Sequence, residues 1–194
     1  MEEEEGIKSA FELAMERISG LPKLTPEEKA EQKEREYAPI GTSIAVKYMD
    51  GALADSELPI QLKRYDGIHQ RIVRRALISS LCREINFANG RDTVRKAWNG
   101  VSRIAPEQRG ALESIEKSFW EISAEFEAAK EQRFREFVIS ANDGIKKLGI
   151  SGSAIRPNLN ENEQWEQELN EARKAYEPKL KNIVDSLMRE LGSS

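Results

Sequence analysis

The residues of this chain best suited to chemistry form a basic segment, residues 63–75. Five cations with two interleaved aromatic side chains make it up: Lys63, Arg64, Tyr65, His69, Arg71, Arg74 and Arg75. Such a mixture is typical of surfaces that face phosphates. On a helix, however, the last three arginines share one side, and the chain has 34 acidic residues that could pair with them. The sequence therefore favours ion pairs on the flank of a buried helix. An anionic partner such as RNA, a nucleotide or an acidic protein surface is the alternative.

Metal and hydrolase chemistry find little support in the sequence. The single histidine, His69, follows Asp66 by three residues, which could place two metal ligands on one helical face. Ferritin-like sites and the common histidine-rich zinc sites need further histidines. A serine triad would need His69 as its base, and no nucleophile-elbow sequence accompanies it. We expect no catalytic residue, no metal and no cofactor, and a structural or exposed His69.

The composition and the single cysteine bear on the cellular compartment and on the kinds of partner that we expect. The net charge of −4 gives no general support for nucleic-acid or membrane binding. Cys82 is the one cysteine, and its apolar surroundings predict a buried, inert thiol. Four glutamates follow Met1, unlike a targeting peptide, and no apolar run approaches the roughly 20 residues of a membrane helix. We expect a cytoplasmic protein.

Two long amphipathic stripes dominate the second half of the chain. In residues 107–141 and again in 165–191, apolar residues recur at spacings of three and four, as on one helical face. We predict two long helices, the first ended by residues 142–144 and the second kinked but continuous at Pro178. Joined by a link over about residues 144–158, they should pack as an antiparallel hairpin with a coiled-coil-like seam containing Phe119, Ile122 and Phe126. A protruding seam needs a cover, so we predict a homodimer.

The first half of the chain predicts shorter helices. One should span about residues 7–19, and Thr25 with Glu28 forms a capping box that starts another. Pro39 and Gly41 are expected to break that second helix, and a new apolar face should run to about Gly51. Residues 55–59 are expected to be a loop, residues 68–87 the most buried helix, and residues 91–104 a shorter one. Trp120 lies off the main apolar stripe of its helix. For this side chain we favour packing inside the protein over a place on a partner surface.

Three segments resemble an uncharacterised family of bacterial helical proteins, a domain of unknown function. They are residues 8–14 (KSAFELA), 24–28 (LTPEE) and 149–158 (GISGSAIRPN). The resemblance implies a bacterial cytosolic protein. It carries no active-site residues that could be transferred to this chain.

Together these patterns predict an all-α protein. Residues 1–105 should form an N-terminal helical cluster and residues 106–194 the long hairpin, the two folding as one cooperative domain. The function we expect is that of a non-enzymatic interaction or scaffold protein, self-associating or bound to a protein partner. The alternative is binding of an anionic ligand or nucleic acid through the basic segment, with no role at a membrane.

Overall fold

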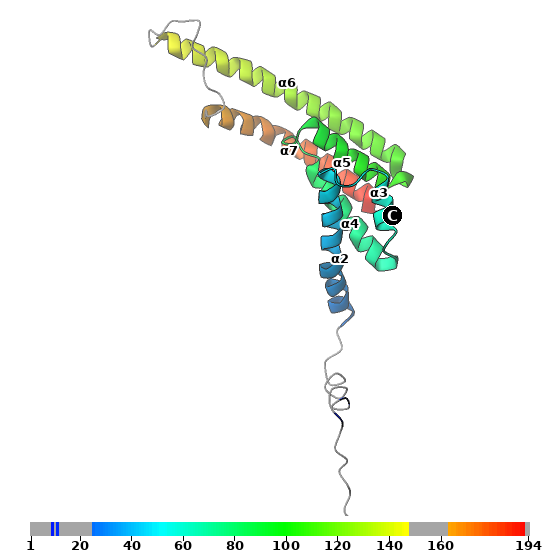
Figure 1. The fold of residues 1–194 in the computed structure, drawn as a ribbon. Coiled ribbons are helices and arrows are strands. Elements are labelled where there is room, and N and C mark those ends of the chain that lie inside the picture. The colour runs from blue at the N-terminus through cyan, green and yellow to red at the C-terminus, as the bar shows by residue number, and fades with distance from the viewer. Residues whose placement is uncertain (1–8, 10, 12–24, 148–162, 193–194) are drawn as a thin grey trace, which may run out of the picture. The chain divides into compact units, whose positions relative to one another are not determined.

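The fold is all-α, as predicted. The computed structural model describes Ser9, Phe11 and residues 25–147 and 163–192, and these contain helices with no strand. The helices are α2 (Pro26–Met49), α3 (Glu57–Leu62), α4 (Gly67–Glu84), α5 (Arg91–Ile104), a 3-10 turn (Pro106–Gln108), α6 (Arg109–Lys147) and α7 (Glu163–Gly192) (Figure 1). None of these helices is long and apolar enough to cross a membrane. Apart from Ser9 and Phe11, the predicted helix over residues 7–19 lies outside the described residues, as does most of the predicted link.

The chain divides into two compact units, Met1–Glu36 and Tyr37–Ser194, and α2 begins in the first unit and ends in the second. The start of α2 is the predicted capping box. The backbone N–H of Glu28 donates to Thr25 Oγ1 at 3.2 Å, and the backbone N–H of Thr25 donates to Glu28 Oε2 at 2.7 Å. Each group satisfies a donor that the helix start leaves free, which explains why this boundary is readable from sequence.

The predicted break at Pro39 and Gly41 is wrong, because α2 passes through both residues. Pro39 is exposed, so water can bond the backbone carbonyl that its missing N–H leaves unpaired. Gly41 is buried against α4, where an added Cβ would lie 2.3 Å from the Val73 carbonyl oxygen and 2.9 Å from the Leu77 nitrogen. The glycine therefore serves close packing between two helices and does not end one.

Other boundaries also differ from the sequence-based expectation. Helix α4 ends at Glu84, three residues before the expected end at residue 87. Residues 57–62 form α3, although residues 55–59 were expected to be a loop. Pro59 is tolerated because it lies in the first turn, where a helix does not use its N–H. Helix α6 continues through Gly144 to Lys147, although we expected it to end at residues 142–144. One glycine inside a helix costs only about 1 kcal/mol, which a long helix tolerates. Helix α7 runs through Pro178 as one helix, as predicted.

Helices α3 to α7 and the second half of α2 share one apolar core. Its largest fully buried side chains include Trp98, Tyr48 and Phe119. Cys82 is 4% exposed within this core, as the sequence predicts, and burial raises the pKa of its thiol from 9.0 to about 12. The one proton of the Tyr48 hydroxyl is shared between Asp55 Oδ1 and the Lys96 carbonyl oxygen, each 3.0 Å away, and this ties α2 to α5 and to the chain before α3.

Helices α6 and α7 lie side by side and run antiparallel (Figure 1). Lys179 Nζ lies 2.7 Å from Glu125 Oε2, and Arg133 Nη1 lies 2.9 Å from Glu168 Oε2. The contact residues of α6 thus rise in number as their partners on α7 fall in number, which is the pattern of antiparallel helices. Phe126 is 2% exposed between these helices, against Phe87 at a ring distance of 4.8 Å.

The shared core extends along only part of the two long helices. Among the described residues, its members on α6 end at Ile122, and its members on α7 begin at Leu180. Beyond them we define the distal segment as residues 131–147 of α6 with residues 163–172 of α7. Of the described side chains in the distal segment, Ala172 alone is buried. This part of the molecule is therefore a helix pair with little core of its own.

Candidate functional site

The structure separates the cations of the basic segment into two groups. Arg74 forms an ion pair with Glu107 at 2.8 Å and is only 21% exposed, as the ion-pair interpretation expects. In the part of the chain that the structure describes, Lys63, Arg64 and Arg71 are exposed and have no carboxylate within 4.0 Å. At least three cations of the segment thus have no acidic partner among the described residues.

Two aromatic residues of the basic segment, Tyr65 and His69, form a cluster with Tyr37 of α2. The ring of Tyr37 stacks on His69 with centroids 4.3 Å apart and planes 17° apart, and Tyr65 meets Tyr37 edge-on at 6.3 Å. His69 Nδ1 lies 3.8 Å from Asp66 Oδ1, so the pair interacts ionically only when the imidazole is protonated. The described residues contain no group of three or more histidine, cysteine or acidic residues that could hold a metal. Sequence reasoning missed Tyr37, because nothing in a helical period links residues so far apart along the chain.

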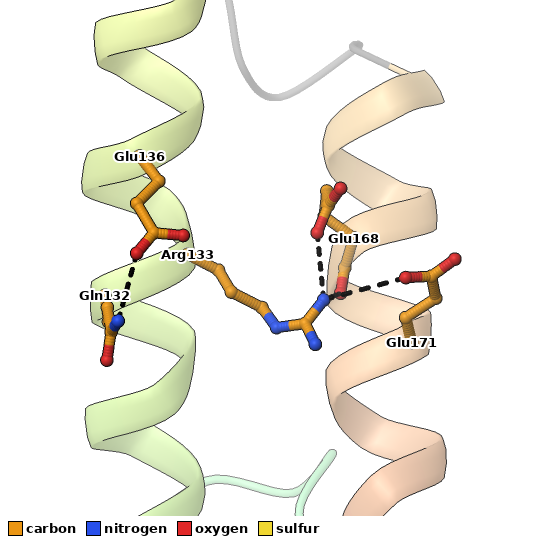
Figure 2. A network of polar contacts seen from close by, with 5 residues as sticks. All are labelled: Gln132, Arg133, Glu136, Glu168 and Glu171. Carbon is orange, nitrogen blue, oxygen red and sulfur yellow. Dashed lines mark hydrogen bonds and ion pairs between the residues drawn. The ribbon is translucent and has the colours of Figure 1, made fainter.

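The distal segment is held together by one arginine and a small aromatic cluster. Figure 2 shows Arg133 reaching from α6 to α7, where its Nη1 lies 2.9 Å from the Glu168 carboxylate and 3.7 Å from that of Glu171. The same nitrogen donates to the Glu168 carbonyl at 3.4 Å. A turn away, the ring of Trp165 meets Phe134 at 5.3 Å and Phe137 at 5.9 Å. The apolar stripes predict the aromatic contacts, whereas the partner of Arg133 carries no sequence signal.

Apolar side chains nevertheless remain in contact with water in the distal segment. Ile139 is 63% exposed and Phe134 is 38% exposed. A pair of helices has no further layer that could cover these large apolar side chains within the same molecule. They are therefore candidates for contact with another molecule.

Trp120 takes an intermediate position. It is partly buried, as internal packing predicts. Its ring centroid lies 5.1 Å from that of Phe119, and its indole N–H donates to Glu116 Oε1 at 3.0 Å. The Arg91 guanidinium lies 5.3 Å from the centre of its ring. Trp120 also lines a surface cleft between α6 and the chain that precedes α5.

Comparison of the chain with known proteins finds no matching family model, no matching curated protein and no matching solved structure. The resemblance to a bacterial helical family therefore stays a prediction, and the function is argued from the geometry of the molecule itself.

Proposed function

We propose that this protein is a non-enzymatic helical interaction protein that forms a homodimer through its distal segment. The observation that carries the proposal is the pair of exposed apolar side chains, Ile139 and Phe134, on helices that extend past the shared core. Full burial of a large apolar side chain is worth about 1.5–3 kcal/mol, so covering both would favour association.

The charges of the distal segment favour a second copy as the partner. Residues 163–172 of α7 contain four glutamates and no cation, whereas residues 131–147 of α6 contain four cations and three acids. In a two-fold arrangement that packs α6 of one copy against α7 of the other, a net positive helix and a net negative helix would face each other. The proposal thus joins apolar burial to electrostatic complementarity in one symmetric interface.

Matched variants test where the proposed interface lies. Ile139→Lys places a charge in the distal segment, and Ile60→Lys places the same charge at an apolar residue of α3 that is 56% exposed. In gel filtration with light scattering, the first variant should shift the full chain toward monomer and the second should leave it dimeric. Equal behaviour of the two variants would contradict the placement of the interface.

A reducing compartment, the cytoplasm, fits this proposal. It is supported by the single cysteine, which is buried. A bacterial source is supported by the sequence resemblance alone.

The basic segment supports a second candidate function, binding of an anionic ligand or a single-stranded nucleic acid. The specific observation is that the exposed cations Lys63, Arg64 and Arg71 lie within a few residues of Tyr65 and His69, whose rings contact Tyr37, since base stacking and phosphate contacts occur together in such proteins. Fluorescence anisotropy with a labelled single-stranded RNA at about 50 mM salt tests it. Arg64→Gln with Arg71→Gln should weaken binding and flatten its salt dependence. Arg74→Gln should change binding less, because Glu107 already engages Arg74. Undetectable binding at this salt concentration would remove the candidate.

A further inference from the structure

A cleft on the second unit has the size and lining of a small-molecule site. Its volume is about 550 Å³, within the range of about 300–1,000 Å³ that such sites occupy. It lies between the loop at residues 85–90, the start of α5 and the middle of α6. Neither the distal segment nor the basic segment contributes a residue to it.

The loop that forms one side of the cleft is fixed by its own hydrogen bonds. Asn86 Oδ1 accepts from the backbone N–H groups of Ala88 and Asn89, at 2.8 and 2.9 Å. Asn89 Nδ2 donates to the Glu84 carbonyl at 3.0 Å and to the Glu84 carboxylate at 2.8 Å. A ligand would thus meet a preformed wall and would lose little affinity to ordering of the loop.

Aromatic rings form the floor of the cleft. Phe87, from the loop, stacks on Phe119 with ring centres 6.0 Å apart. The rings of Phe119 and Trp120 are nearly perpendicular, with centres 5.1 Å apart. The indole N–H of Trp120 is already bonded to Glu116, so the side chain is held in place. Val94 of α5 also borders the cleft, although it is only 2% exposed. A flat apolar group would find here both area and favourable ring contacts.

The side chains that line the cleft carry a net positive charge, which favours a negatively charged ligand. Lys130 is paired with Glu127 at 3.1 Å, so these two charges largely cancel. Arg91 lies over the Trp120 ring, and no carboxylate of the described chain lies within 4.0 Å of it. A guanidinium that lies by an aromatic ring, with no acidic partner among the described residues, keeps its donors available for an oxyanion.

We propose that this cleft binds a small organic anion that joins a flat aromatic body to one carboxylate or sulfonate. The aromatic body lies against Phe87 and Trp120, and the anionic group binds the Arg91 guanidinium. The proposal is independent of dimer formation through the distal segment, because it uses other residues.

A fluorescent aromatic sulfonate, 8-anilinonaphthalene-1-sulfonate, tests the site on the full chain, with the uncharged N-phenyl-1-naphthylamine as its matched ligand. Arg91→Gln should weaken binding of the sulfonate about tenfold or more, the usual loss for a charge-assisted hydrogen bond, and should leave the uncharged ligand unaffected. Arg95→Gln removes an exposed cation of α5 outside the cleft and should change neither affinity. Equal weakening by both variants, or by neither, would overturn the proposal.

Two further measurements locate the ligand and define its class. Indole-3-acetate should displace the fluorescent sulfonate, whereas inorganic phosphate at the same concentration should not, because phosphate lacks the aromatic body. In a ¹H–¹⁵N correlation spectrum, indole-3-acetate should shift the indole signal of Trp120, assigned through Trp120→Phe, and leave that of Trp165 unchanged. Displacement by phosphate, or a shift confined to Trp165, would contradict the assignment.

Discussion

Gly41→Ala should destabilise the protein although alanine is the better helix former. In an exposed helix interior this change would gain about 1 kcal/mol. At position 41 the added Cβ would meet the Val73 carbonyl oxygen at 2.3 Å, the Ala76 Cβ at 2.8 Å and the Leu77 nitrogen at 2.9 Å. Two of these are backbone atoms that no side-chain rotation can move. Overpacking costs about 1–3 kcal/mol, and backbone obstruction places this site at the upper end. The net loss should be about 1–2 kcal/mol.

Thermal and urea unfolding followed by circular dichroism measure this loss. In a chain of this length 1 kcal/mol corresponds to about 2–4 °C in Tm, so Gly41→Ala should lower Tm by about 2–8 °C. Gly110→Ala is the matched control, because a Cβ there would have no neighbour within 4 Å, and that variant should be as stable as the natural protein or more so. If Gly41→Ala raised Tm as well, α2 would not approach α4 as closely as the structure has it.

Two other substitutions probe buried side chains. Phe126→Ala removes a ring that is 2% exposed and should lower the free energy of unfolding by about 3–5 kcal/mol. Phe134→Ala, at 38% exposure, should lower it clearly less. Urea unfolding of both variants compares them, and equal losses would contradict the burial assigned to Phe126. The Cys82 thiol has a raised pKa, so the folded protein favours the protonated thiol and its stability should fall as pH rises above about 9; Cys82→Ala should lessen that fall in unfolding curves at pH 8 to 10. The thiol should react with Ellman's reagent only as fast as the chain unfolds, and immediate reaction would show that Cys82 is exposed.

The all-α fold could be predicted because its signals are local. A period near 3.6 marks the faces of α6 and α7, and Thr25 and Glu28 satisfy each other within one turn. Burial of Cys82 follows from its apolar neighbours in sequence. The helix boundaries were predicted wrongly where a tertiary contact or exposure to water offset the local preference of a residue. Gly41 weakens an isolated helix, yet here it lets two helices approach.

The candidate sites were harder to predict than the helices, because their geometry joins distant residues. Nothing in the sequence links Tyr37 to His69 or Arg133 to Glu168, and each pair forms only once helices pack. The basic segment was visible as a run, but its division into the paired Arg74 and the unneutralised Arg71 depends on where Glu107 lies. Composition identifies such candidates, and the fold decides which of them share a surface.

Sedimentation equilibrium of the unmodified chain tests the central proposal, self-association, most directly. One chain has a mass of 22.0 kDa. Over a series of concentrations from the nanomolar to the micromolar range, the account predicts a molar mass that rises to twice that of one chain and stays there. A mass of one chain throughout the series would contradict the dimer and leave the distal segment without its proposed role.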